Sequence, residues 1–347
     1  MSNDTISQVH LHDSTSIDGS WARHSNQGRG KMIKIIADST CDLTEDILKK
    51  YDIELASLII TIEGDEYRDR VDITPDTFYD QIENYSKPPT PGMPSPADFT
   101  DLMKKAVDDG YKEILCICMS SGTSGSFQSA ELGKKYFHEM EACKDVPVYV
   151  VDSKSMSHGS GWLIIKSARL RDQGATFQEL IDFNESYKCN VKHFLSVDDL
   201  DHLIRSGRLS NASAFIGKIL RLKPIMTMKD SKGAIVAKER GRKRVLDHYV
   251  NAFVKRMDKD LTDFIIIGYT SDISYANNLK GKIETETDFS GEIFIMQMGV
   301  AVGTHVGLGG LSLFFVEKDR MRDNLLTNEW ESMVKKKDRF LEKYRHQ

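Results

Sequence analysis

A loop of small hydroxyl residues at positions 120–126 is the stretch of this sequence best suited to chemistry. It follows an apolar run at 114–119 and precedes a helical pattern, and it carries neither Lys nor Arg. We therefore expect its hydroxyls and backbone N–H groups at the C-terminal end of a buried strand, where open α/β sheets bind anions. The loop lacks the Gly-Lys-Ser/Thr ending of a phosphate-binding P-loop, which favours a carboxylate as the bound group. Its hydroxyls belong to Ser120, Ser121, Thr123, Ser124 and Ser126.

Further hydroxyl and acidic residues follow the other strands expected in the first half of the chain. The C-terminal ends of parallel strands meet at one edge of a sheet, so residues far apart in sequence can share one pocket there. The alternative is a structural role, because such residues also form turns and cap helices; Ser95, followed by Pro96, is a candidate N-cap. The additional residues are Ser39, Thr40, Thr90, Ser95, Asp152 and Ser153.

His305 lies in a glycine-rich segment at 299–310. Glycines allow backbones or a ligand to come close to the imidazole, which makes His305 a candidate ligand contact, although most single histidines are structural or exposed. An esterase or acyl-transfer enzyme is an alternative, with Ser121 or Ser124 as nucleophile and His305 as base. The Gly-x-Ser-x-Gly nucleophile motif of many such enzymes is absent. A phosphotransfer domain is disfavoured because clustered Asp metal ligands are missing.

Basic residues cluster once, at 238–244, with Arg205 and Arg208 further upstream. Arg208 and Arg242 are candidates for contacting a phosphate group or an acidic protein partner, since a guanidinium binds both with paired hydrogen bonds. The alternative is solvated surface charge or an internal ion pair.

The composition disfavours several classes of protein. The net charge of −5 supplies no basic field for nucleic acid. Five cysteines without a CxxC pair are typical of a reduced, cytoplasmic protein and predict no metal site. No apolar run approaches the roughly 20 residues of a membrane span, and the first 30 residues lack the apolar region of a signal peptide.

Strand and helix patterns alternate along most of the chain, which predicts an α/β fold. We expect a disordered extension at 1–31, an α/β domain with a mainly parallel sheet at 32–190, an α/β domain with a mixed sheet at 191–316, and an amphipathic C-terminal helix at 317–347. In more detail, we expect one strand at 54–63, an irregular loop at 87–94, a helix over 211–220 and a β-hairpin made from 222–228 and 234–241. We expect neither a helix nor a strand in the glycine-rich segment at 299–310.

Taken together, six ordered motifs resemble the DegV family of fatty-acid-binding proteins. The resemblance runs from about residue 32 to residue 316. In chain order the motifs are Asp38-Ser39-Thr40-Cys41-Asp42-Leu43, Pro94-Ser95-Pro96, Ser120-Ser121-Gly122-Thr123-Ser124-Gly125-Ser126-Phe127-Gln128-Ser129-Ala130, Gly207-Arg208-Leu209-Ser210, Lys223-Pro224-Ile225, and His305 with the glycines after it.

The resemblance implies that a long-chain fatty acid is buried between two α/β domains and that the protein has no catalytic centre or cofactor of its own. It also implies a partner, the catalytic subunit of a fatty acid kinase, which phosphorylates the carboxylate for phospholipid synthesis. The chain departs from the family at Pro91-Gly92-Met93-Pro94-Ser95, where Thr-Ser-x-Pro-Ser is usual, and at Gly307-Leu308-Gly309, where Gly-Pro-Gly is usual. By this resemblance, the residues expected to hold the carboxylate are Ser121, Ser124, His305, Ser95, Thr90 and Ser120.

Overall fold

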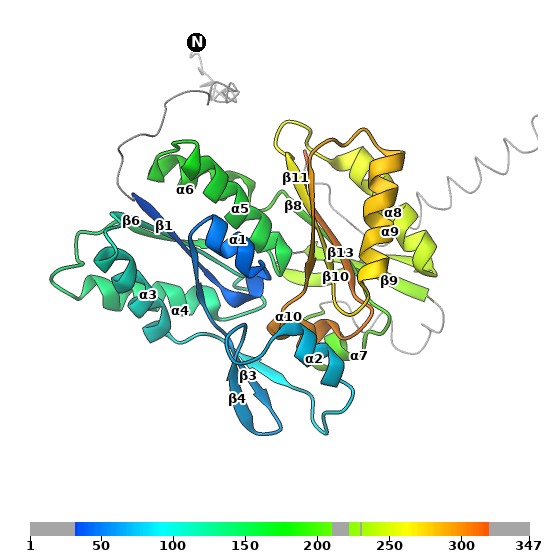
Figure 1. Ribbon diagram of the computed structural model, residues 1–347, viewed down its shortest axis with the longest axis horizontal. Helices are drawn as coiled ribbons and strands as arrows, with labels where there is room; N and C mark the ends of the chain where they lie inside the picture. The colour runs from blue at the N-terminus through cyan, green and yellow to red at the C-terminus, as the bar shows by residue number, and fades with distance from the viewer. Residues whose placement is uncertain (1–31, 210–221, 230, 319–347) are drawn as a thin grey trace, which may run out of the picture.

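The computed structural model describes residues 32–209, 222–229 and 231–318. Its first sheet has four parallel strands, and the order along the sheet is β2-β1-β6-β7. β1 is buried along its whole length, as expected of a β-branched apolar run covered on both faces. Figure 1 shows this sheet on one side of the molecule. The strands are β1 (Ile33–Asp38), β2 (Ile53–Ala56), β6 (Glu113–Cys118) and β7 (Val148–Asp152).

Helices cover both faces of this sheet. α3 and α4 pack together on one face, and α5, the longest of the group, packs on the other. α3 begins where expected, because Ser95 accepts a hydrogen bond from the Asp98 N–H and the Asp98 carboxylate accepts one from the Ser95 N–H. The helices of this half are η1 (Ser39–Cys41), α1 (Glu45–Lys50), α2 (Pro75–Gln81), α3 (Pro96–Asp108), α4 (Ser126–His138), α5 (His158–Asp172) and α6 (Phe177–Tyr187).

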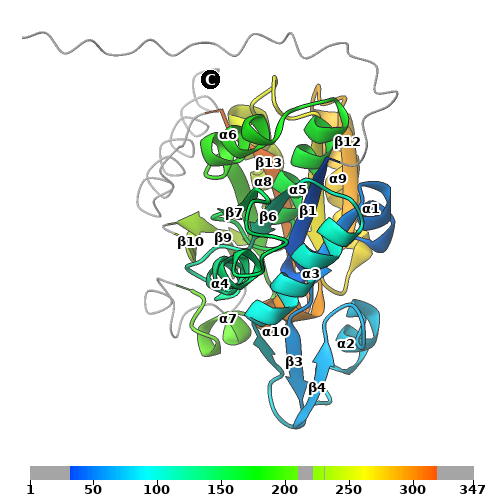
Figure 2. The same ribbon diagram turned by 90° about the vertical axis from the view of Figure 1, so that its left-hand side faces the viewer.

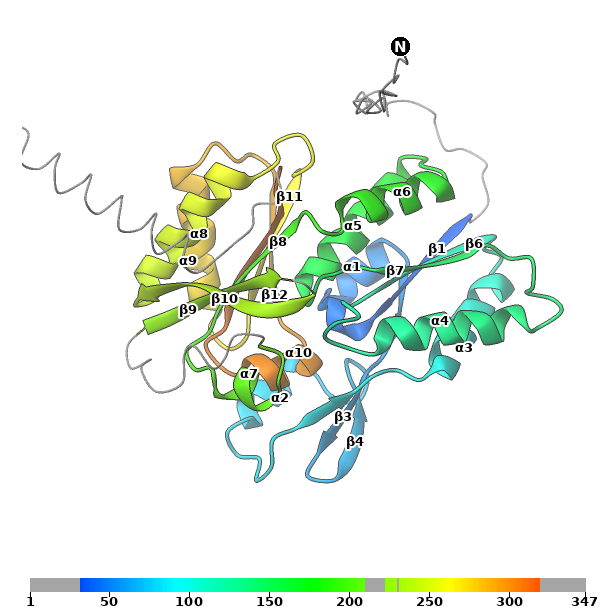
Figure 3. The same cartoon turned by 180° about the vertical axis from the view of Figure 1, so that it is seen from behind.

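The second sheet has six strands in the order β10-β9-β8-β13-β11-β12, and only β11 and β12 run parallel. The predicted mixed sheet and the β9–β10 hairpin are therefore confirmed. α8 and α9 cover one face of the sheet, as Figure 1 and Figure 3 show. The elements are β8 (Val191–Ser196), α7 (Asp201–Arg205), β9 (Leu222–Lys229), β10 (Lys232–Arg240), α8 (Arg242–Arg256), β11 (Phe264–Tyr269), α9 (Ile273–Glu286), β12 (Glu292–Gln297), α10 (Val300–Val306) and β13 (Leu311–Val316).

A third, three-stranded antiparallel sheet was not expected. β3 (Ile59–Ile62) pairs with β4 (Asp65–Arg68) and with β5 (Thr90–Gly92). The single strand expected at 54–63 is thus wrong: it divides into β2 and β3, which belong to different sheets. The loop expected at 87–94 contains β5. Figure 2 shows β3 and β4 projecting at one end of the molecule, beside α2.

The two large sheets share one apolar core around α5. Trp162 of α5 stacks on Phe264 of β11, with ring centroids 5.2 Å apart, and its indole N–H donates to the Phe264 carbonyl at 3.1 Å. The same cluster contains Ile35 and Leu115 of the first sheet and Phe314 of the second. The predicted boundary at 190/191 coincides with the start of β8, and the division into two domains stays a prediction. The extension at 1–31, the helix over 211–220 and all but two residues of the C-terminal helix lie outside the described residues.

Candidate functional site

A cavity of about 230 Å³ lies where the loop after β6, the small sheet and α10 come together. Most of the side chains that line it are apolar, and five are polar. The apolar lining comes from Leu58, Pro91, Met93, Met119, Met156, Leu195, Leu203, Ala301, Val302 and Val306. The polar lining comes from Thr40, Thr123, Ser124, Arg208 and His305.

The carboxylate of Asp38 holds the hydroxyl loop at the end of β6. Its Oδ2 accepts from the Met119 N–H at 2.8 Å and its Oδ1 from the Thr40 N–H at 3.1 Å. Burial raises the pKa of Asp38, while these hydrogen bonds act in the opposite direction. The loop then turns on itself, since the N–H groups of Thr123 and Ser124 both donate to the Ser120 carbonyl. This turn brings Thr123 and Ser124 to the cavity wall.

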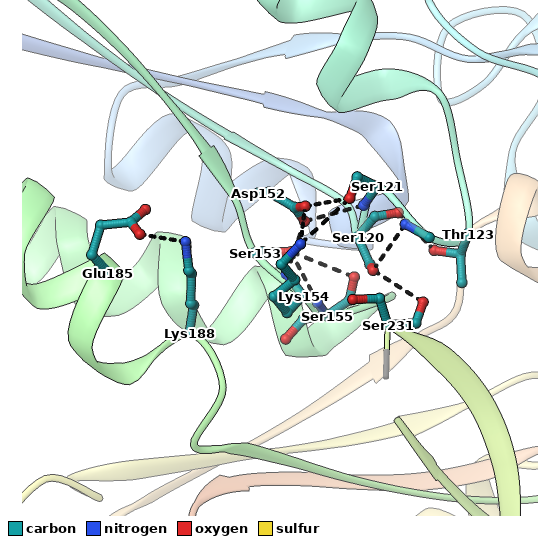
Figure 4. Close-up of polar contacts among 11 residues, drawn as sticks. Ser120, Ser121, Thr123, Asp152, Ser153, Lys154, Ser155, Glu185, Lys188 and Ser231 are labelled. Carbon is teal, nitrogen blue, oxygen red and sulfur yellow. Dashed lines mark hydrogen bonds and ion pairs between the residues drawn. The ribbon is translucent and has the colours of Figure 1, made fainter. Parts of the chain in front are cut away.

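Ser124 and Ser121 face different surroundings. Ser124 lines the cavity, and its Oγ lies 3.0 Å from the Ser126 Oγ. Ser121 is not among the lining residues; its hydroxyl and its N–H both donate to Asp152, which also pairs with Lys154 (Figure 4). The structure therefore separates these two candidates, and the predicted contact of Ser121 with a carboxylate stays a prediction.

The other predicted hydroxyls also lie away from the cavity wall. Ser120 is buried and donates to the backbone carbonyl of Ser231 at 3.2 Å. Ser95 is the exposed N-cap of α3, the structural role given above as the alternative. Thr90 is an exposed residue of β5, although its neighbour Pro91 lines the cavity.

His305 reaches the cavity because α10 is held against the first half of the chain. The N–H of Gly299, just before the helix, donates to Asp42 at 2.8 Å, and the Tyr79 hydroxyl donates to the Met298 carbonyl at 3.1 Å. Burial, with a smaller contribution from the positive charge of Arg208, lowers the pKa of His305 to about 4. The imidazole is thus uncharged at neutral pH and can donate one hydrogen bond to a ligand.

The two candidate arginines occupy different places. Arg208 lines the cavity, and its Nη1 donates to the Ser206 carbonyl at 2.7 Å. Arg242 forms ion pairs with Asp272 and Asp198 and lies over the Tyr275 ring. Arg242 thus has the internal ion pairs that were the alternative to a partner contact, whereas Arg208 supplies the cavity with a positive charge that the hydroxyl loop itself lacks.

Sequence reasoning included Thr40 among the strand-end hydroxyls that could share one pocket but did not single out the methionines. Met93, Met119 and Met156 all line the cavity, yet each follows or precedes a polar turn rather than forming a periodic pattern. Their convergence depends on how β5, β6 and β7 end, which no local spacing reveals.

The geometry does not assemble a Ser-His nucleophile pair. Ser121 and Ser124 have other hydroxyl or carboxylate partners, and within the described ranges no hydrogen bond joins either of them to His305. Over the same residues, no cluster of His, Cys, Asp or Glu could hold a metal ion. None of the described helices is long and apolar enough to cross a membrane.

Comparison with known proteins gives a consistent match. The family model described as "Uncharacterised protein, DegV family" matches residues 32–318. A DegV domain-containing protein of Clostridium acetobutylicum is 36% identical over 289 residues, which cover 83% of this chain and 99% of the relative.

Two solved structures are similar over most of their length. A fatty-acid-binding DegV family protein of Thermus thermophilus has 26% identity and a TM-score of 0.74, covering 82% of this chain and 99% of that one. A stearic-acid-binding protein of Eubacterium ventriosum has 25% identity and a TM-score of 0.73, covering 83% of this chain and 99% of that one. The matched range, together with the near-complete alignment to the Clostridium relative, shows that this chain belongs to the DegV family.

Proposed function

We propose that this protein binds a long-chain fatty acid in the cavity and presents the carboxyl group to a separate kinase subunit, which converts it to an acyl phosphate. The observation that carries the proposal is the lining, in which a mainly apolar wall also contains a guanidinium, an uncharged imidazole and hydroxyls. Ligand sites commonly combine such walls with a few polar groups that fix the ligand's orientation. Solved relatives that bind fatty acids support the same ligand class.

The two parts of the ligand would be bound by different forces. Each buried CH₂ group contributes about 0.8 kcal/mol before the cost of ordering the chain. The carboxylate would accept hydrogen bonds from His305 and Ser124, with Arg208 as the nearby positive charge, whereas the Thr123 hydroxyl already donates to the Ser120 carbonyl. The apolar wall thus supplies affinity, and the polar groups supply orientation.

Four other residues could contact the carboxylate only if they move when a ligand binds. They are Ser120, Ser121, Ser95 and Thr90. Their present partners satisfy them elsewhere, except that Thr90 has no side-chain hydrogen bond among the described residues. We therefore place the carboxylate at Ser124 and His305 first.

A binding role without catalysis is the form of the proposal that the geometry favours. An acyl-enzyme mechanism needs a base in contact with the nucleophile, and the described residues provide no such pair. A separate subunit must then supply the phosphate donor and the catalytic groups.

Arg208 and Arg242 allow the presentation step to be tested if phosphorylation is measured at saturating fatty acid, because Arg208 also lines the cavity. Arg208→Ala and Arg242→Ala would be compared with wild type for fatty-acid affinity and for acyl-phosphate formation with a bacterial fatty acid kinase subunit and ATP. We expect Arg208→Ala to lose phosphorylation and Arg242→Ala, whose guanidinium is already paired, to keep it. Unchanged phosphorylation in Arg208→Ala, or no phosphorylation of the wild-type complex, would contradict the proposed presentation.

A further inference from the structure

The cavity has two walls that come from distant parts of the chain. One wall is the hydroxyl loop that follows β6, including Met119 and residues 123–125. The segment after β8 supplies another part of the lining, with Leu203 and Arg208. Any contact that joins this loop to this segment limits how far the two walls can separate.

The β9–β10 hairpin packs against the second wall through the middle of its two strands. Met226 of β9 and Ile235 of β10 belong to the same apolar cluster as Leu203 and Val302, which line the cavity. The pairing register shifts between Ile235 and Ala237, the mark of a β-bulge, and bulges bend the strand that contains them. The hairpin thus packs against residues that line the cavity.

Ser231, just before β10, lies on the hydroxyl loop (Figure 4). The Ser120 hydroxyl donates to the Ser231 carbonyl at 3.2 Å. At Gly122 an added Cβ would lie 2.6 Å from the Ser231 carbonyl oxygen and 2.7 Å from the Ser231 Cβ, so only glycine permits this approach. Ser231 itself has a φ of +65°, a left-handed conformation that few non-glycine residues adopt.

Two residues further on, the hairpin contacts the other wall. Leu209 forms an isolated parallel bridge with Gly233. A Cβ added at Gly233 would lie 3.0 Å from the carbonyl oxygen of Arg208, so this approach is also close. Residues 231–233 therefore touch the hydroxyl loop on one side and the Arg208 backbone on the other.

We propose that these contacts form a clasp, made by Ser231 and Gly233 of the hairpin with Ser120, Gly122 and Arg208, which holds the two cavity walls together and sets how fast a bound fatty acid exchanges. The inference rests on the proposed function, since it concerns access to the same cavity. It adds a control element whose members, apart from Arg208, lie outside the cavity lining.

Gly122→Ala tests the clasp without altering a lining residue. The added methyl group must push Ser231 away, so we expect the dissociation rate of a fluorescent fatty acid to rise at least about fivefold, because most affinity changes within one site appear in that rate. Gly281→Ala is the matched control, because Gly281 lies in α9 and a Cβ there meets nothing within 4 Å. Equal dissociation rates in Gly122→Ala and wild type would overturn the proposal.

A reversible cross-link tests the clasp in the opposite direction. The variant combines Gly122→Cys with Ser231→Cys, and the two new thiols can join after a shift of about 1 Å. It also carries Cys189→Ser, because Cys189 is the one native cysteine that is not buried among the described residues. We expect oxidation to slow fatty-acid exchange at least about tenfold and a reductant to restore it, with each single-cysteine variant insensitive to oxidant.

The outcomes separate the clasp from the proposed function. A disulfide that forms but leaves the exchange rate unchanged would refute the clasp, and two cysteines that fail to join would contradict the Gly122–Ser231 contact itself. Absence of fatty-acid binding at equilibrium in wild type and reduced double-cysteine protein would instead contradict the proposed function.

Discussion

Ser124 and Ser121 are three residues apart in the same loop, yet only Ser124 lines the cavity. Ser124→Ala should weaken fatty-acid binding by about 1–3 kcal/mol, the usual cost of removing a hydrogen bond to a charged acceptor. Ser121→Ala should change binding by less than about 0.5 kcal/mol, because the Ser121 hydroxyl already donates to Asp152. Calorimetric titration of both variants measures the difference, and equal losses would contradict the placement of the carboxylate at Ser124.

Two buried histidines predict how stability depends on pH. Burial lowers the pKa of both His158 and His193 to about 3, whereas the unfolded chain titrates near about 6.5. The unfolded state therefore binds more protons than the native state between these values, so these two groups reduce the free energy of unfolding as the pH falls. Asp42 acts in the opposite sense, because burial raises its pKa to about 7.

His193→Asn isolates one of these groups, since every other titrating residue stays the same. As the pH falls from roughly 6 to 4, the free energy of unfolding of the variant should rise relative to that of wild type by about 1.4 kcal/mol for each pH unit. Denaturant titrations over this range provide the comparison. Two stability curves that run parallel would show that His193 is protonated equally in both states.

At the scale of single elements, α3 offers a test of whether Ser95 caps a helix or holds a ligand. Ser95→Ala should lower the free energy of unfolding by about 1 kcal/mol, the usual cost of losing an N-cap. Fatty-acid affinity should not change, because the Ser95 hydroxyl pairs with Asp98 and lies outside the cavity lining. A large loss of affinity with unchanged stability would restore Ser95 as a carboxylate contact.

Local patterns were sufficient for elements that carry their own start and stop signals. Ser95-Pro96 begins α3 as predicted, and Thr74-Pro75 gives α2 the same kind of start. Local patterns were insufficient for the apolar run at 55–62, which contains neither Gly nor Pro to mark a break. The strand breaks there because distant groups take its backbone hydrogen bonds: the Leu58 N–H donates to the Ser39 hydroxyl, and the Leu58 carbonyl accepts from Asp69.

The glycine-rich segment shows the same limit in a helix. Gly303 costs about 1 kcal/mol relative to alanine in a helix interior, and Val and Thr are weak helix formers, so local propensity predicts no helix at 300–306. Packing requires the glycine instead: a Cβ at Gly303 would lie 2.4 Å from the Tyr79 hydroxyl oxygen. The sequence thus indicated that His305 lies where backbones come close, but not that a short helix directs it into the cavity.

The candidate site was predictable only as a collection of residue types. The strand-end rule led to the hydroxyl loop, and Ser124 and His305 do share the cavity. Which loop hydroxyls face the cavity depends on a turn closed by the Ser120 carbonyl, and Arg208 reaches it from the other half of the chain. Neither arrangement has a signal in residue spacing.

At the scale of the whole molecule, the shared core around α5 predicts that both large sheets unfold together. Trp162 contacts the second sheet through Phe264 and is fully buried. Trp162→Ala should lower the free energy of unfolding by about 3–5 kcal/mol. The variant should still show a single unfolding transition, at the same denaturant concentration by circular dichroism and by fluorescence of an external label. Two separated transitions in wild type would show that the halves fold as independent domains.

The central claim, that a long-chain fatty acid occupies the cavity, is tested most directly by the lipid content of the protein. Purified protein would be weighed by native mass spectrometry, then denatured, and its extracted lipid identified. We predict roughly one long-chain fatty acid per chain, because the lining combines an extended apolar wall with few polar groups. Protein that carries no lipid and fails to bind added C14–C18 acids would contradict the account.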